Sequence, residues 1–206
     1  MKKKIILASK SIDRCEILKR AKISFDTISA NINENEFKDR INNPIQLVKE
    51  LAKAKVLYAK KKVLEKNIDA IIIGADTIVE FKGEIIGKAN NEDQAFRILK
   101  KLQNESHNLL TGLAITETFY QKLIVDYENT VVYFAHLSDQ EILTYVKSGE
   151  WKGRAGAYSI RDKASLFVKS INGSFSNVVG LPLFKINEIL NKEFNFNLFE
   201  RNKFLN

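Results

Sequence analysis

One carboxylate, Asp76, is set into a strongly apolar run that extends from Ala70 to Val79. Isoleucine and valine fill this run, and they predict a buried strand over residues 70–81. An ionised carboxylate in such surroundings is costly unless a cation or hydrogen-bond donors stabilise it. Two cations are candidates: the ammonium of Lys88, which follows a short predicted hairpin, and a divalent metal ion. Asp76 could therefore assist attack of water on a phosphoryl group; the alternative is an ion pair with Lys88 that only stabilises the fold.

A second constellation combines Ser9, Ser11 and Arg14 at the point where a predicted strand ends and a predicted helix begins. Free backbone N–H groups at a helix N-terminus favour an anion. The two hydroxyls add donors, and a guanidinium matches the oxygens of a phosphate. Asp13 opposes an anion at this place, although it suits the helix dipole. The alternative is a plain helix cap with a surface arginine, and the residues alone favour neither.

Two further charged residues, Glu34 and Lys55, are less specific. Glu34 lies in an acidic segment, residues 30–36, that could help to hold a metal, but the residues alone favour a solvated turn. Lys55 falls on the spacing of the apolar residues of a predicted helix over 44–64, so it could emerge beside the buried face. As one lysine among many, it carries little information by itself.

The composition limits the class of protein. With 206 residues and 45% hydrophobic residues, the chain can build a proper core as one large domain or two packed lobes. The net charge of +8 fits either a nucleic-acid surface or a lysine-rich enzyme surface. We favour the enzyme and expect no nucleic-acid partner, because no aromatic residues interleave with the basic ones. A single cysteine and the lack of a membrane-length apolar run predict a cytoplasmic protein without a membrane anchor.

Apolar periodicity and capping residues predict alternating strands and helices. Strands are expected over residues 4–9, 25–31, 70–81, 84–86, 109–118, 123–136 and 166–171, and helices over 11–22, 44–64, 92–102, 138–147 and 182–192. Ser11, Asn43 and Ser138 stand where they can cap helices, and Glu141 completes a capping box with Ser138. The order of elements predicts an α/β fold with a mixed sheet rather than a purely parallel one.

Nine segments, in this order and at this spacing, resemble the Maf (septum-formation) family. The matching segments are Leu7-Ala8-Ser9-x-Ser11-x-x-Arg14, Glu34, Leu51-Ala52-x-x-Lys55, Gly74-Ala75-Asp76-Thr77, Gly87-Lys88, His107-x-x-x-Thr111-Gly112, Ser148-Gly149-Glu150, Ala155-Gly156-Ala157-Tyr158 and Val178-Val179-Gly180-Leu181-Pro182. No single motif would decide the matter, but nine in register through nearly the whole chain make the resemblance specific.

The resemblance implies a nucleoside triphosphate pyrophosphatase. Such an enzyme cleaves between the α- and β-phosphates and gives a nucleoside monophosphate and pyrophosphate; dTTP, UTP or modified nucleotides are the expected substrates. The implied cofactor is a divalent cation, Mg²⁺, Mn²⁺ or Co²⁺. The implied fold is an elongated single domain over residues 1–206, with a mixed central sheet and a deep cleft between two lobes. It would be related to the inosine-triphosphate pyrophosphatases.

The resemblance also assigns roles to residues. In the family, the Asp of the Gly-Ala-Asp-Thr segment accepts the proton, which implies this role for Asp76. Glu34 and Asp76 are the expected metal-holding carboxylates, and either could deprotonate a water whose pKa the metal has lowered. The expected substrate-binding residues are Ser9, Ser11, Arg14, Lys55, Thr77 and Lys88. All except Thr77 are expected to supply hydrogen-bond donors or positive charge to a triphosphate.

The chain departs from the family pattern at the positions expected to choose the base. Ile12 and Asp13 replace the family's Pro-Arg, and Arg161 stands where the branch acting on dTTP and UTP carries Gln. Ala89 follows Lys88 in place of Pro. Thr77 does fit the dTTP/UTP branch. The specificity residues are therefore Asp13, Thr77 and Arg161, and we hypothesise that Asp13 and Arg161 form a charge-swapped pair across the base pocket.

We therefore predict a cytoplasmic, metal-dependent nucleoside triphosphate pyrophosphatase whose partner is its nucleotide substrate. A homodimer is left open by the sequence. The alternative is a non-catalytic nucleotide-binding regulator of cell division, but Glu34, Lys55, Asp76 and Lys88 are all intact, which argues against it.

Overall fold

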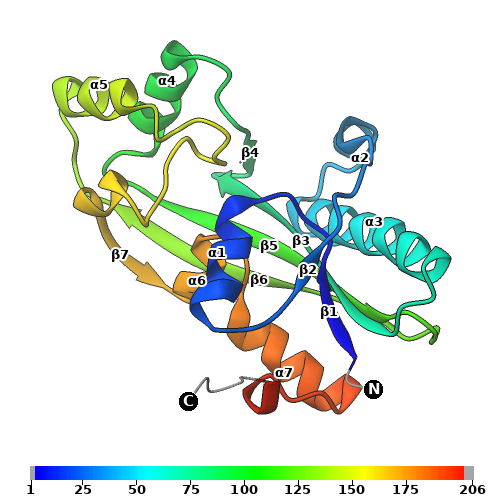
Figure 1. Ribbon diagram of the computed structural model, residues 1–206. Helices are drawn as coiled ribbons and strands as arrows, with labels where there is room; N and C mark the ends of the chain where they lie inside the picture. Colours follow the sequence, from blue (N-terminus) through cyan, green and yellow to red (C-terminus); the bar gives the residue numbers. More distant parts are fainter. Residues whose placement is uncertain (1–2, 202–206) are drawn as a thin grey trace. The chain divides into compact units, whose positions relative to one another are not determined.

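The computed structural model describes residues 3–201, so both ends of the predicted 1–206 domain lie outside the described residues. The strands are β1 (Lys4–Leu7), β2 (Asp26–Thr27), β3 (Ala70–Phe81), β4 (Glu84–Ile86), β5 (Ser106–Glu117), β6 (Leu123–Phe134) and β7 (Val168–Asn172). The helices are α1 (Ile12–Arg20), α2 (Glu34–Arg40), α3 (Pro44–Glu65), α4 (Glu92–Leu102), α5 (Asp139–Ser148), η1 (Lys163–Leu166), α6 (Phe175–Val178), α7 (Leu183–Phe194) and η2 (Phe199–Arg201) (Figure 1).

The strands form one mixed sheet in the order β2-β1-β3-β5-β6-β7, with β4 paired to β3. Strand β1 is parallel to both β2 and β3, whereas the β3–β4 and β6–β7 pairs are antiparallel. The prediction of an α/β fold with a mixed sheet is therefore confirmed.

Two expectations about elements are wrong. The strand predicted over residues 25–31 shrinks to the two residues of β2, Asp26 and Thr27, which are both exposed and bury no apolar surface against a partner layer. The turn expected around Glu34 is helix α2. Its first turn carries acidic residues and its last turn basic ones, which suits the helix dipole.

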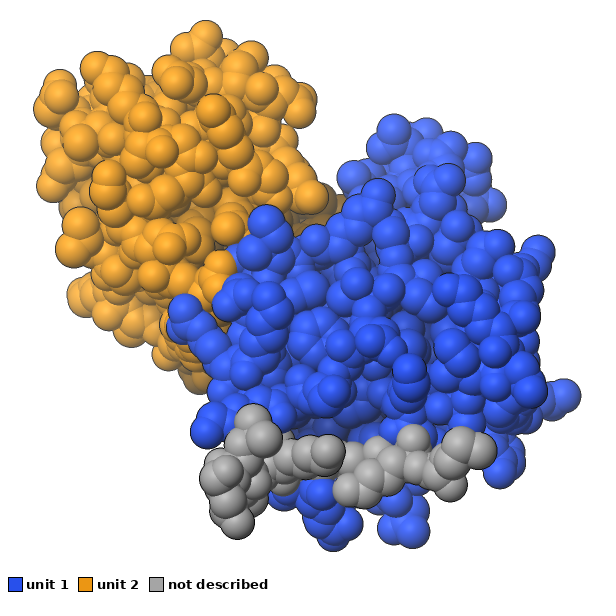
Figure 2. Space-filling model, viewed as in Figure 1, with its two compact units in different colours: residues 1–76, 111–128, 180–206 blue, residues 77–110, 129–179 orange. Residues whose placement is uncertain are grey.

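The chain divides into two compact units, which Figure 2 colours separately. Unit 1 comprises residues 1–76, 111–128 and 180–206, and unit 2 comprises residues 77–110 and 129–179. Strands β3, β5 and β6 each run from one unit into the other. The predicted cleft between two lobes stays a prediction.

In unit 1, helix α3 lies beside the sheet (Figure 1), and it packs closely because two strand residues facing it are glycines. A Cβ on Gly74 of β3 would lie 2.6 Å from a methyl carbon of Val56, and a Cβ on Gly112 of β5 would lie 2.1 Å from the carbonyl oxygen of Val48. Helix α3 begins where the sequence predicts, with the side chain of Asn43 accepting a hydrogen bond from the Gln46 amide. The glycines therefore determine how near the charged residues of α3 come to β3.

In unit 2, helices α4 and α5 pack against each other (Figure 1), and a core of aliphatic and aromatic residues lies beneath them. The predicted capping box at the start of α5 is present: Ser138 Oγ accepts from the Glu141 amide, and the Glu141 carboxylate accepts from the Ser138 amide at 2.8 Å. None of the described helices is long and apolar enough to cross a membrane.

Candidate active site

The centre of the site in unit 1 is an ammonium held by two carboxylates. Nζ of Lys55, on α3, lies 2.5 Å from Oδ1 of Asp76, on β3, and 2.8 Å from Oε1 of Glu34, the first residue of α2. The side chains of Lys55 and Asp76 are each only 11% exposed, whereas that of Glu34 is 41% exposed. The cation that the sequence demands for Asp76 is therefore Lys55, from the helix that packs on Gly74.

A group of donors lies at the N-terminus of α1, also in unit 1. Ser11 caps the helix, as predicted, by accepting from the Arg14 amide. Nη1 of Arg14 donates to Oγ of Ser9 at 3.2 Å, and Nε of Arg14 donates to the carbonyl oxygen of Gly180 at 2.7 Å. The guanidinium is thus fixed between the end of β1 and the segment that leads into α7. Arg14 is therefore not a loose surface arginine, whereas binding of an anion at this place stays a prediction.

The guanidinium of Arg14 interacts electrostatically with the carboxylates of Asp76 and Glu34. Burial lowers the pKa of Arg14 below its ordinary value, while the negative charges of Asp76 and Glu34 oppose that shift and raise the pKa. Because a guanidinium stays protonated in proteins, Arg14 adds a second positive charge to the surroundings of Asp76. Unit 1 therefore brings together two cations, two carboxylates and the hydroxyls of α1's N-terminus.

The buried carboxylate of Asp13 lies in the first turn of α1, with 6% of the residue exposed. Where the family carries a positive charge, this chain thus keeps a negative one inside unit 1. Arg161 belongs to unit 2. The hypothesis that Asp13 and Arg161 pair stays a prediction.

Thr77 and Lys88 also belong to unit 2. Successive side chains of a strand point to opposite faces, so Thr77 shares its face of β3 with Val79 and lies on the other face from Asp76. Val79 packs in the core of unit 2. Lys88 is exposed, and its backbone forms an isolated antiparallel bridge with Ala155.

Glu34 and Asp76 can hold a divalent cation only with help from other ligands. Residues 3–201 contain no group of three or more His, Cys, Asp or Glu side chains placed to hold a metal ion. Two carboxylates that converge on one cationic atom are nevertheless a hard oxygen donor set. Mg²⁺ typically binds through one or two carboxylates, keeps several waters and takes further oxygens from substrate phosphates. The two carboxylates are therefore compatible with a cation of this kind, provided that its other ligands come from water or a bound anion.

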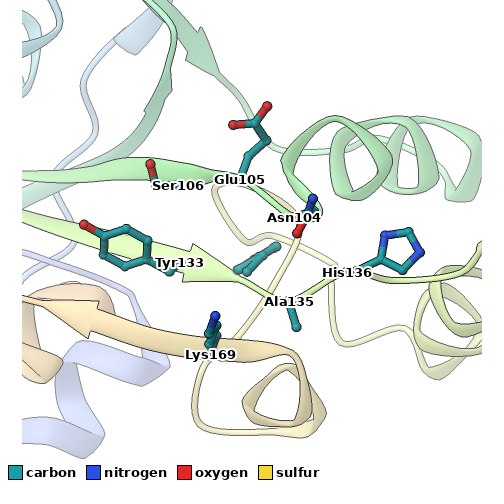
Figure 3. A pocket seen from close by; sticks show the side chains of 8 residues that line it. Asn104, Glu105, Ser106, Tyr133, Ala135, His136 and Lys169 are labelled. Atoms are coloured by element: carbon teal, nitrogen blue, oxygen red, sulfur yellow. The ribbon is translucent and has the colours of Figure 1, made fainter.

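A pocket of about 550 Å³ lies in unit 2 (Figure 3). Its lining comes from the ends of β5 and β6, from β7 and from the neighbouring loops, and includes Tyr133, His136 and Lys169. None of the residues predicted for the site lines it. The geometry of the charged groups, rather than this hollow, therefore locates the candidate active site.

Sequence reasoning undervalued Lys55, and it named Gly180 in a matching segment without giving it a role. Lys55 shares its helix face with Leu47 and Leu51, which are fully buried. A charged residue among buried apolar residues of a helix needs an oppositely charged or hydrogen-bonding partner. The position of Lys55 on this helix face was therefore the signal that could have indicated its ion pair. The carbonyl of Gly180 contacts an arginine 166 positions away, and no local pattern could have indicated this contact.

The chain is similar to known proteins over most of its length. A family model described as "Maf-like protein" matches residues 4–193. A protein of Caldicellulosiruptor saccharolyticus named dTTP/UTP pyrophosphatase is 42% identical over 190 residues, covering 92% of this chain and 94% of its own. A protein of the same name from Alkaliphilus oremlandii is 43% identical and covers 95% of this chain and 99% of its own length. Another, from Dictyoglomus thermophilum, is also 43% identical and covers 93% of this chain and 97% of its own length.

A solved structure is also similar, but only distantly. It is a nucleoside-triphosphatase / dITP/XTP pyrophosphatase from Mycobacterium abscessus, 10% identical, with a TM-score of 0.35, covering 65% of this chain and 74% of its own. A similarity at this level carries no argument about fold or function, so the expected relation to inosine-triphosphate pyrophosphatases stays a prediction.

Proposed function

Because the chain belongs to the Maf family, we propose that it is a nucleoside triphosphate pyrophosphatase that hydrolyses dTTP and UTP to the monophosphate and pyrophosphate. The observation that carries the proposal is the contact of the mostly buried Lys55 ammonium with both Asp76 and Glu34, with Arg14 in electrostatic range of both carboxylates. The names of relatives at 42–43% identity support the choice of dTTP and UTP.

In the proposed reaction, Asp76 accepts a proton from the water that attacks the triphosphate. A carboxylate is suited to this role because its oxygens can accept the proton while the neighbouring cations hold the side chain in place. Ser9, Ser11 and Arg14 donate hydrogen bonds to phosphate oxygens, and Lys55 and Lys88 add positive charge. Positioning and charge neutralisation of this kind are the main contributions a protein makes to phosphoryl transfer.

Glu34 and Asp76 would hold the divalent cation, Mg²⁺, Mn²⁺ or Co²⁺. When bound, such an ion offsets negative charge that builds up on the phosphate oxygens and lowers the pKa of water. The hard oxygens of the two carboxylates support this assignment.

The base is proposed to be chosen by Thr77, Asp13 and Arg161. Thr77 matches the dTTP/UTP branch, whereas Asp13 and Arg161 differ from it. If the last two form a pair, Asp13→Ala and Arg161→Ala should show coupled effects on substrate preference in a double-mutant cycle. Independent effects would remove the pairing hypothesis.

A nucleotide panel with Mg²⁺, Mn²⁺ or Co²⁺, scored separately for pyrophosphate and orthophosphate, tests the proposed function. We expect pyrophosphate from dTTP and UTP in preference to the other nucleotides. Release of orthophosphate would indicate cleavage at the terminal phosphate and contradict the proposal. Nucleotide binding without turnover would instead favour the non-catalytic regulator.

A further inference from the structure

Lys55 occupies the point at which two carboxylates meet. Its Nζ lies within 2.8 Å of an oxygen of each, from Asp76 and from Glu34. We propose that Lys55 holds the place of the divalent cation: its ammonium neutralises the two carboxylates in the metal-free protein, and cation binding displaces it toward the phosphates. The inference deepens the proposed function and rests on it for the identity of the substrate.

The first step of the argument concerns charge. Asp76 and Glu34 together carry two negative charges, and the ammonium reduces the sum to one. Asp76 is only 8% exposed, and a buried carboxylate without a partner is strongly destabilising. The metal-free protein therefore needs a cation at this point, and Lys55 supplies it from within the chain.

The second step is competition. A divalent cation bound by the same two oxygens would lie close to the ammonium, and like charges at such a distance repel strongly in a partly buried site. The ammonium and the metal ion therefore exclude each other from the shared position. The coupling is reciprocal. The factor by which the bound metal ion weakens the contact of the ammonium with the carboxylates is also the factor by which the ammonium weakens metal binding.

The third step is where the ammonium goes. A lysine carries its charge on a flexible four-carbon stem, so Lys55 can leave the carboxylates without moving α3. Arg14 is already in electrostatic range of both carboxylates, and its guanidinium contacts Ser9. The released ammonium joins these donors, so metal binding and phosphate binding strengthen each other through one side chain.

Mn²⁺ binding to the nucleotide-free protein, followed by the electron paramagnetic resonance of the free ion, tests the proposal without any turnover. We expect Lys55→Met to bind Mn²⁺ roughly tenfold more tightly than the wild type, within the range typical of coupling between sites. The matched control is Lys53→Met on the same helix, which removes an ammonium paired with Glu50 instead and should leave the Mn²⁺ affinity unchanged. Lys55→Arg keeps the positive charge and should stay close to the wild type.

A second titration measures the opposite effect. With saturating Mn²⁺, inorganic tripolyphosphate should bind Lys55→Met more weakly than the wild type, because the ammonium no longer reaches the phosphates. Unchanged or weaker Mn²⁺ affinity in Lys55→Met would overturn the proposal; if that variant does not fold, Lys55→Gln gives the same decision. Tighter Mn²⁺ binding by Lys55→Met, together with a wild-type protein that releases no pyrophosphate from dTTP, would instead refute the proposed function alone.

Discussion

Asp76 is the residue on which the proposed chemistry depends most. It is a carboxylate in an apolar strand, and its ion pair with Lys55 explains how it is tolerated there. The same ion pair joins it to Glu34 through a shared ammonium. The arrangement gives each charged side chain a defined neighbour before any substrate arrives.

His107 is a second buried titratable residue, and it lies in unit 2. Nε2 of His107 is 2.9 Å from the Tyr158 hydroxyl, and the ring packs edge-on against Phe134. Within residues 3–201, its Nδ1 has no hydrogen-bond partner. Burial lowers the pKa of His107 from 6.5 to about 4, because the protonated imidazole loses the water that would stabilise its charge.

This pKa predicts how the free energy of unfolding depends on pH. Above pH 6.5 the imidazole is neutral in both states. As the pH falls toward 4, the unfolded chain gains a proton that the folded protein does not bind, so stability is lost; the loss reaches about 3 kcal/mol at pH 4. His107→Gln should lose that much less stability on acidification, as measured by urea unfolding at pH 7 and pH 4. Parallel losses in the two proteins would show that His107 is not the group responsible.

At the scale of elements, helix α3 determines the geometry of the site. It crosses β3 and β5 where Gly74 and Gly112 leave no side chain between helix and sheet. Val48, Ala52 and Val56, which face the sheet from α3, are fully buried. This close contact is what lets Lys55 reach Asp76.

Gly112→Ala should therefore destabilise the protein by more than about 2 kcal/mol, since the new Cβ meets backbone atoms of Val48 that cannot rotate away. Chemical denaturation measures the effect. Gly87→Ala is the matched control, because a Cβ there meets nothing within 4 Å, and it should change stability little. Equal stability of the two variants would contradict the close approach of α3.

The elements that the sequence predicts well are those with local determinants. The caps by Ser11, Asn43 and Ser138 are all present, and the apolar run of β3 has the expected bounds. Failure occurs where tertiary contacts decide. Only two residues of the segment around β2 pair with β1, and α2 presents no fully buried residue that periodicity could have indicated.

At the scale of the whole molecule, the family and the class of fold could be predicted because their motifs are spread over the chain. The site could be predicted only as a set of residues. Which cation meets Asp76 depends on how α3 packs on the sheet. The ion-pair partner of Asp76, Lys55, is not one of the two cations that the sequence offers as candidates, Lys88 and a divalent metal ion. The cytoplasmic location, the absence of a nucleic-acid partner and a homodimer stay predictions.

The most direct test of the proposed activity is pyrophosphate release from dTTP and UTP by the wild type and by Asp76→Asn. The substitution keeps the shape of the side chain but removes its negative charge and its capacity to accept a proton. We expect the variant to fold, as judged by circular dichroism, and to lose pyrophosphate release by at least about a hundredfold, the lower bound typical of general-base catalysis. Wild-type turnover by a folded Asp76→Asn protein would contradict the assignment of Asp76 and with it the proposed mechanism.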